Sequence, residues 1–223
     1  MCGRYGLALS EEELRELFEG ADVPAAYQPR YNIAPTQEAL VARGTEAGPE
    51  LVWARWGLIP YGEDAVRAGA RHINARSETA AARWPFRDAF ARRRCLVPAS
   101  GFYEWRASAG GKLPYWIQAA GPLTLAGLWE PGRGGDPPSF TILTRDAPAG
   151  LAHIHDRVPV VVAPEWRRAW LDNPTPAGEL QTVMRDLPPP LRAHPVSRRV
   201  NRAGEDDPAL VEPVDEPLEL PLE

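Results

Sequence analysis

The chain has 223 residues, of which 44% are hydrophobic, and this is enough to bury the core of one domain. No stretch approaches the roughly 20 uncharged apolar residues of a membrane span, and the start of the chain has no apolar signal core. We therefore expect a cytoplasmic protein that does not bind membranes. The two cysteines, Cys2 and Cys95, exclude a disulfide framework and a cysteine-based metal site.

The net charge of −5 is unevenly distributed along the chain. Residues 204–223 contain eight acidic side chains and no basic one, so residues 1–203 carry a net charge of +3. Almost all of the positive charge is arginine, because Lys112 is the only lysine. We expect a single domain over 1–203, followed by an acidic, proline-rich tail at 204–223 that is poorly ordered and not needed for folding.

In chain order, Ser10 and Glu13 form a capping box that predicts a helix over residues 11–19, which ends at Gly20. Residues 21–37 are rich in proline and irregular. Further helices are expected near 77–92, 164–172 and 176–186. Short apolar or alternating runs bounded by glycine, proline or aspartate predict strands. These runs cover 38–43, 50–58, 94–98, 101–107, 113–119, 123–129, 138–144 and 157–163.

This order of elements predicts an α+β fold. Its core is expected to be a mainly antiparallel, curved or barrel-like sheet with a few short flanking helices.

Cys2 has a distinctive chemistry if Met1 is removed, as usually happens when the second residue is small. The new N-terminus would carry an α-amine with a pKa of about 8 next to a thiol with a pKa of about 8.5. Such a 1,2-aminothiol reacts with an aldehyde to form first an imine and then a five-membered thiazolidine ring. The alternative is that Cys2 is a small core residue near the chain end.

Polar residues in apolar surroundings mark further candidates. Asn74 and Arg76 lie in the segment INARSET, which also reads as a helix N-terminus capped by Asn74 or Ser77. His155 beside Asp156 is suited to proton transfer. His153 and His155 have no evident third ligand, so we expect no metal.

Glu104 lies between aromatic residues in a strand-like run. Alternation predicts that Phe102, Glu104 and Arg106 share one face, with Tyr103 and Trp105 on the other. A carboxyl group among aromatic rings is desolvated, which raises its pKa and suits acid–base work. The alternative is a buried glutamate paired with an arginine.

The segments 31–37 and 53–60 combine aromatic, amide, arginine and turn residues. Asn32 and Trp56 in these segments are candidates for binding single-stranded nucleic acid, because bases stack on aromatic rings while arginine pairs with phosphate. Trp84 and most other tryptophans are expected to be packing residues, and Cys95 a buried structural thiol.

Taken together, these motifs resemble the SRAP (SOS response-associated peptidase) family. The resemblance rests on seven motifs that occur in family order from residue 2 to about residue 201, and the acidic tail lies outside it. The motifs are MCGR at 1–4, YNIAP at 31–35, WGLIP at 56–60, INARSET at 73–79, GFYEW at 101–105, HDR at 155–157 and HPVS at 194–197.

The resemblance implies a DNA-damage response protein. Its expected partner is single-stranded or single-strand/double-strand junction DNA that contains an abasic site, and its expected reaction is a thiazolidine crosslink, with lyase and autopeptidase activities besides. Carried over by motif, Cys2 is the nucleophile, Asn74 orients the aldehyde-derived atoms, Glu104 transfers protons and His155 assists the imine and ring chemistry.

The DNA itself is expected to contact Arg4, Asn32, Trp56, Arg76 and Arg157. We expect a monomer that needs no cofactor.

Two other functions fit the sequence. In a thiol peptidase, Cys2, His155 and Glu104 would act as nucleophile, base and orienting group. With only Met1 ahead of Cys2, self-cleavage would have little to do. A non-catalytic single-stranded DNA-binding module would leave Glu104 and His155 without a role.

Overall fold

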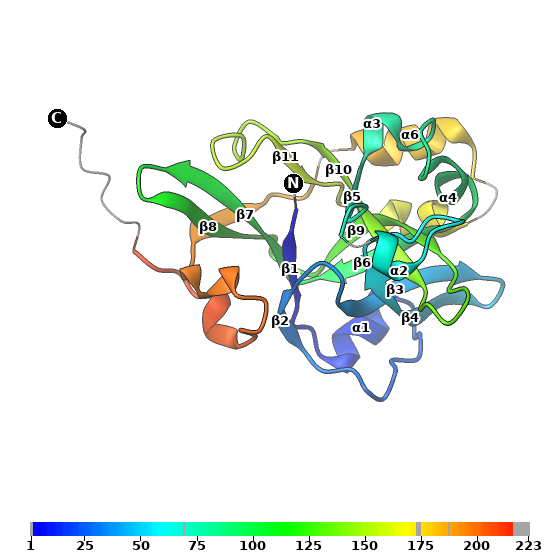
Figure 1. The fold of residues 1–223 in the computed structure, drawn as a ribbon, viewed down its shortest axis with the longest axis horizontal. Coiled ribbons are helices and arrows are strands. Elements are labelled where there is room, and N and C mark those ends of the chain that lie inside the picture. Colours follow the sequence, from blue (N-terminus) through cyan, green and yellow to red (C-terminus); the bar gives the residue numbers. More distant parts are fainter. Residues whose placement is uncertain (1, 69, 173–174, 187, 216–223) are drawn as a thin grey trace.

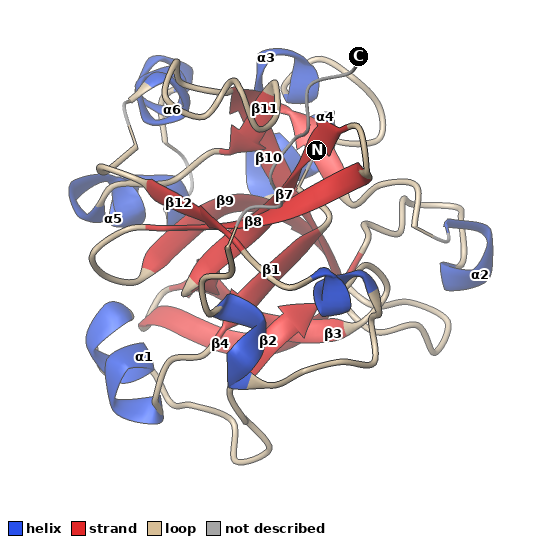
Figure 2. Cartoon of the chain, turned by 90° about the vertical axis from the view of Figure 1, so that its left-hand side faces the viewer, coloured by secondary structure: helices blue, strands red, loops and turns tan. Residues whose placement is uncertain are grey.

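The computed structural model describes residues 2–68, 70–172, 175–186 and 188–215, which form two sheets with short helices around them (Figures 1 and 2). One sheet has five antiparallel strands in the order β12-β8-β7-β1-β2. These strands are β1 (Arg4–Leu7), β2 (Arg30–Ile33), β7 (Gly101–Ser108), β8 (Gly111–Gln118) and β12 (Arg192–Pro195).

The second sheet curls into a ring because β10 pairs with both β4 and β9, which close the path through β3 and β6. The ring is not a regular barrel, since β10 runs parallel to β4 and β5 and antiparallel to its other partners. Its strands are β3 (Glu38–Thr45), β4 (Gly48–Trp56), β5 (Asn74–Arg76), β6 (Arg94–Ala99), β9 (Leu123–Glu130), β10 (Ser139–Asp146) and β11 (Arg157–Pro159). The predicted α+β class with a curved, barrel-like core is confirmed.

The helices are short and lie outside the sheets (Figure 2). They are α1 (Glu11–Leu17), α2 (Ala65–Ala68), α3 (Ser77–Ala80), α4 (Arg87–Arg92), α5 (Arg167–Leu171) and α6 (Ala177–Arg185), with 3-10 turns at Pro164–Trp166, Arg198–Asn201 and Pro208–Val211. The capping box of α1 is confirmed, because Ser10 Oγ accepts from the Glu13 amide while the Glu13 carboxylate accepts from the Ser10 amide. None of the helices in the described part of the chain is both long and apolar enough to cross a membrane.

Several local predictions were wrong. The helix expected over 77–92 is split into α3 and α4 around Trp84-Pro85, because proline cannot continue the backbone ladder. The strand expected over 157–163 ends at Pro159, and only Val161 beyond it forms an isolated bridge. Strands β1, β2, β5 and β12 were missed, since each has only three or four residues.

β1 is an interior strand of the five-stranded sheet, because it pairs with β7 on one side and β2 on the other. Figure 1 shows β7 and β8 to one side of this strand and the ring-like sheet to the other. Tyr5 and Leu7 on β1 are almost fully buried in the main hydrophobic core. Residues 2–7 therefore lie in the seam between the two sheets.

A second hydrophobic cluster lies on the other face of the five-stranded sheet. It contains Tyr103, Trp116, Val196, Val200 and Leu210. Gly101 makes this cluster possible, since a Cβ at that position would lie 2.4 Å from Trp116 Cζ2.

The beginning of the acidic tail covers this second cluster, so the expectation of a poorly ordered tail is wrong for residues 204–215. Leu210 is fully buried in the cluster. The Asp206 carboxylate accepts from the backbone amides of Tyr31 (2.5 Å) and Asn32 (3.0 Å) on the edge strand β2, and it pairs with Arg30. Charge and proline content carry no signal for such hydrogen-bond acceptors. Residues 216–223 lie outside the described residues.

We predict that Asp206→Ala lowers the free energy of unfolding by about 1–3 kcal/mol, because two strand amides and one guanidinium lose their acceptor. A chain that ends at Arg202 should lose more, since Leu210 is also removed from the second cluster. Denaturant unfolding measures both, with the exposed Glu212→Ala in the same segment as control. Full stability of the shortened chain would contradict a structural role for this segment.

Candidate active site

Cys2 lies two residues before the start of β1, and its side chain is fully buried. The Sγ atom donates to the backbone oxygen of Arg4 at 3.6 Å. Burial raises the pKa of the Cys2 thiol, and the nearby Glu104 carboxylate raises it further. The thiol is therefore protonated at neutral pH and needs a base before it can act as a nucleophile.

Glu104 is the buried carboxyl group beside Cys2. It lies on β7, the strand that pairs with β1, and is only 1% exposed. Burial raises its pKa to about 7, so near neutral pH both protonation states are populated. The predicted alternation of β7 is confirmed, because Phe102 belongs to the main core while Tyr103 and Trp105 belong to the second cluster.

His155 approaches Glu104 from the segment before β11. Its Nε2 lies 3.9 Å from Glu104 Oε2. Its Nδ1 lies 2.9 Å from the Arg157 amide and 2.8 Å from Asp156 Oδ1. The amide requires Nδ1 to accept a hydrogen bond, whereas the carboxylate requires it to donate one. Burial lowers the pKa of His155, so we assign the neutral ring, with Nδ1 accepting from the Arg157 amide and Nε2–H on the side of Glu104.

Asn74 tethers the chain end to the ring-like sheet. It begins β5, and its Nδ2 donates to the Cys2 carbonyl oxygen at 2.7 Å. Its Oδ1 is buried and has no hydrogen-bond partner among the described residues. A buried amide oxygen without a donor is costly, so this atom is available to a donor that enters the site. The N-cap predicted for Asn74 or Ser77 is wrong, since Arg76 occupies that position without a side-chain bond.

The structure brings together all four of the side chains predicted to carry out chemistry. Glu104 is near enough to Cys2 to raise the pKa of its thiol, and His155 Nε2 lies 3.9 Å from Glu104 Oε2. Asn74 donates a hydrogen bond to the Cys2 carbonyl oxygen. They come from the residues before β1, from β7, from β5 and from the segment before β11, which adjoin at the seam between the two sheets.

Two of the five predicted DNA contacts remain accessible. Arg76 is exposed, and Arg4 is partly buried with its Nη1 donating to the Gly3 carbonyl at 2.9 Å. The Arg4 Nε is buried without a partner among the described residues, and burial lowers the pKa of Arg4. Either guanidinium is able to meet a phosphate from this position.

The other three do not fit a direct DNA contact in this structure, because their side chains are used inside the protein. Trp56 is fully buried against Tyr5 at 5.2 Å between ring centroids, and its Nε1 donates to the Ile73 carbonyl. Asn32 is fully buried and its Nδ2 donates to the Glu205 carbonyl at 2.8 Å.

Arg157 is the third, and it is 8% exposed. Its guanidinium pairs with Glu78 at 2.7 Å and Asp146 at 2.6 Å and donates to the Thr144 carbonyl. Glu78 lies in the INARSET motif, but Asp146 lies in no motif and gave no sequence signal. These contacts tie β11 to α3 and so hold the segment that carries His155.

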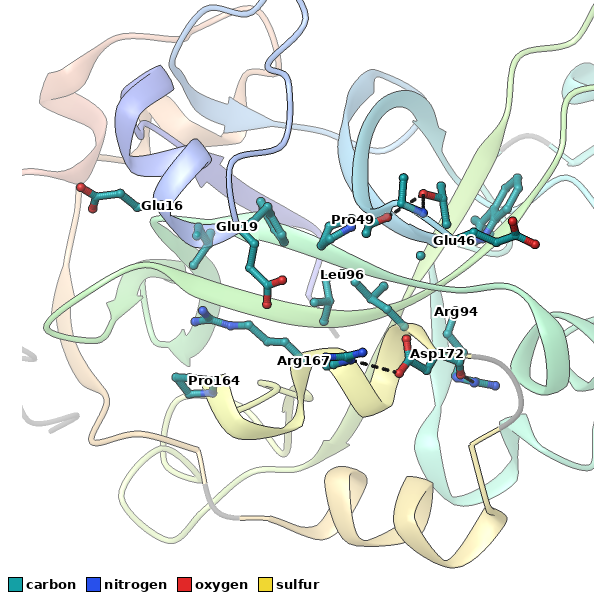
Figure 3. Close-up of a pocket in the computed structure, with 18 of the residues that line it drawn as sticks. Glu16, Glu19, Glu46, Pro49, Arg94, Leu96, Pro164, Arg167 and Asp172 are labelled. Carbon is teal, nitrogen blue, oxygen red and sulfur yellow. Dashed lines mark hydrogen bonds and ion pairs between the residues drawn. The ribbon is translucent and has the colours of Figure 1, made fainter.

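A hollow of about 950 Å³ lies elsewhere, between α1, the β3–β4 hairpin and α5, where Glu19, Arg167 and Asp172 line it (Figure 3). Its lining includes none of the four candidate catalytic residues, Cys2, Asn74, Glu104 and His155. Acidic and basic side chains are mixed along its lining, and they do not converge on one point where a reaction could take place. In the described part of the chain, no three His, Cys, Asp or Glu side chains gather into a metal site, and the lack of a metal stays a prediction.

The family model described as SOS response associated peptidase (SRAP) matches residues 1–203. The chain belongs to the SRAP family. Among curated SRAP relatives, the abasic site processing protein YoqW of Bacillus subtilis is 33% identical, over 95% of this chain and 99% of its own length. The abasic site processing protein YedK of Escherichia coli is 31% identical, over 96% of this chain and 100% of its own.

Solved structures share this fold. A phage-related protein from Bordetella bronchiseptica is 33% identical with a TM-score of 0.73, over 88% of this chain and 95% of its own. A protein from Bacteroides thetaiotaomicron has a TM-score of 0.81 at 21% identity, over 96% of this chain and 100% of its own, and supports the fold alone.

We predict that Glu104→Gln changes how stability depends on pH. A carboxyl group whose pKa is raised in the folded state binds more protons when folded than when unfolded, so its burial costs stability as pH rises from about 4.5 to about 7. Relative to the wild type, Glu104→Gln should therefore gain about 1–3 kcal/mol between about pH 5 and about pH 8.

Denaturant unfolding at the two pH values measures this difference. The control is Glu12→Gln, which removes an exposed carboxylate from the first turn of α1. A difference between Glu104→Gln and the wild type that stays constant with pH would contradict the raised pKa.

Proposed function

We propose that this SRAP protein crosslinks itself to abasic sites in DNA through the α-amine and thiol of Cys2, exposed when Met1 is removed. The observation that carries the proposal is the Glu104 carboxyl group, 1% exposed with a pKa near 7, which acts on the buried Cys2 thiol at the start of an interior strand. Membership of a family whose curated relatives are named abasic site processing proteins supports the substrate.

The reaction forms two bonds and releases one water. The Cys2 nitrogen adds to the aldehyde carbon of the ring-opened sugar, and the aldehyde oxygen becomes a hydroxyl group. This hydroxyl leaves as water when Glu104 donates a proton to it, which gives the protonated imine. The Glu104 carboxylate then takes the thiol proton as Sγ adds to the imine carbon, and the nitrogen keeps its own proton as the ring amine. Glu104 thus ends protonated, in its starting state.

The neighbouring groups support these steps. His155 Nε2–H lies on the side of Glu104 and stabilises its carboxylate form after the first proton transfer. Asn74 holds the Cys2 carbonyl, and its Oδ1 is suited to accept from the amine or from a sugar hydroxyl. Arg4 and Arg76 supply positive charge for the flanking phosphates of single-stranded or junction DNA.

The peptidase alternative has less support from this geometry. Cysteine peptidases lower the pKa of their nucleophile so that it is a thiolate at neutral pH. Here burial and Glu104 raise the pKa of Cys2, so the thiol carries its proton. Burying the Glu104 carboxyl group beside Cys2 costs stability. A module that only binds DNA would gain no function from that cost.

We predict that Cys2→Ala gives no denaturant-resistant band with single-stranded DNA that contains an abasic site, because the ring sulfur is missing. Cys2→Ser keeps the amine and should give a less stable adduct. Protein that retains Met1 should not react, since the Cys2 nitrogen is then an amide. The control is Cys95→Ala, which removes the other buried thiol from a different strand. A full band from Cys2→Ala would exclude the mechanism.

We predict that the crosslinking rate has a bell-shaped dependence on pH, with a maximum between about 7 and about 8. Below this range the amine, with a pKa of about 8, is protonated. Above it Glu104 loses the proton it donates, because its pKa is about 7. Glu104→Gln should react about 10²–10⁴-fold more slowly and lose the alkaline decline.

Rapid-quench kinetics across pH measures the rate, and binding to DNA with an unreactive abasic analogue measures affinity. Glu104→Gln should keep the affinity of the wild type. If its affinity falls as much as its rate, Glu104 acts in binding or folding and not in proton transfer.

A further inference from the structure

Two exposed aromatic side chains line one shallow hollow. Tyr61 is 79% exposed and Trp84 is 66% exposed, which corrects the expectation that Trp84 is a packing residue. Both line a hollow of about 280 Å³ beside α4. Single exposed aromatic residues are common on protein surfaces, but two around one hollow place flat apolar faces where a planar ligand can enter between or against them.

The charge around these rings is positive. Arg87, Arg92, Arg93 and Arg133 line the same hollow, together with the two acids Asp88 and Glu130. Each acid has an arginine partner, at 3.1 Å for Arg87–Asp88 and 2.6 Å for Arg93–Glu130. The lining therefore has two more positive than negative charges.

The Arg133 guanidinium lies over the Tyr61 ring, 4.4 Å from its centroid. A guanidinium that stacks on an aromatic ring still has N–H donors with which to bind a phosphate. Aromatic faces next to guanidinium groups are the combination that binds unpaired nucleotides, because the base stacks and the phosphate pairs with arginine. In a duplex the base faces are already covered by their neighbours.

The hollow is connected to the candidate active site by one segment. Residues 72–86 begin at His72, whose ring meets Trp84 edge-on at 6.2 Å, and they include Asn74, which holds the Cys2 carbonyl. A strand that reaches Cys2 past Asn74 therefore has this surface close to its path.

We propose that the Tyr61–Trp84 hollow is a second contact for the damaged strand, which binds an unpaired nucleotide beyond those at the abasic site. The base stacks on Trp84 or Tyr61, and Arg133 and Arg87 meet the phosphates. The identity of the ligand as the damaged strand rests on the proposed function, whereas the preference for unpaired nucleotides rests on the hollow itself.

The test measures the affinity for oligonucleotides that carry a tetrahydrofuran abasic analogue, which has no aldehyde and cannot crosslink. With a single strand of about 20 nucleotides, Trp84→Ala should bind about 5–20-fold more weakly than the wild type. Trp84→Phe keeps a ring and should recover most of the affinity. Arg133→Ala should lower the slope of log affinity against log salt by about 1.

The matched control is Arg168→Ala on α5, an arginine whose side chain is 86% exposed and which lies outside this hollow. It should bind as the wild type does. The effect of Trp84→Ala should shrink toward none with a strand of about 4 nucleotides centred on the analogue, because the proposed contact lies beyond the nucleotides at the abasic site.

Equal affinity of Trp84→Ala and the wild type for the long strand would overturn the proposal. So would an equal loss with long and short strands, or a loss that Trp84→Phe does not recover, since either result indicates a change in the 72–86 segment instead of lost stacking. Because the analogue cannot crosslink, these outcomes do not depend on whether Cys2 forms the adduct. Failure of the proposed function would appear separately, as no crosslink to aldehyde-bearing DNA.

Discussion

The burial of the chain start beside a carboxyl group is the constraint on which the rest of this structure depends. N-terminal residues are usually exposed, but here β1 is an interior strand and Cys2 is fully buried. Strand pairing with β2 and β7 and the hydrogen bond from Asn74 to Cys2 fix the position of the terminus. The same burial raises the pKa values of both Cys2 and Glu104.

These shifts have one chemical consequence. A freely exposed aminothiol would react with any aldehyde that it meets, at a rate set by bulk pH. In the proposed mechanism, the thiol in the seam holds its proton until Glu104 removes it, and Glu104 also protonates the departing hydroxyl because its pKa lies near neutrality. In that mechanism the cost of burying a carboxyl group is coupled to catalysis. In this account reactivity depends on an aldehyde being placed where Glu104, His155 and Asn74 converge.

The support for this seam comes from distant parts of the chain. Arg157 bridges Glu78 and Asp146, and so connects α3, β10 and β11 around His155. Asp206 and Leu210 cover the outer face of the five-stranded sheet and satisfy the edge strand β2. The domain is therefore completed by residues beyond 203, although the family match ends there.

Much of this arrangement was predictable from sequence, and the exceptions have physical reasons. The amphipathic alternation around Glu104 predicted which face is buried, and short apolar runs predicted the curved sheet, because both patterns are local. Asn32, Trp56 and Arg157 were expected on DNA but are used inside the protein, since their partners are backbone carbonyls and carboxylates far away in sequence. The composition of the tail predicted disorder, but Asp206 accepts hydrogen bonds from two backbone amides of β2. Trp84 was expected to be a packing residue, but it lies on the surface at the Trp84-Pro85 break between α3 and α4.

The most direct test of the central claim is mass spectrometry of the peptide that carries the adduct, after proteolysis of protein reacted with abasic single-stranded DNA. The account predicts that the adduct lies on the peptide that begins with Cys2, that Met1 is absent, and that the total mass equals protein plus DNA minus one water. An adduct on Lys112 or another side chain, or one that requires a free amine but not the Cys2 sulfur, would contradict it.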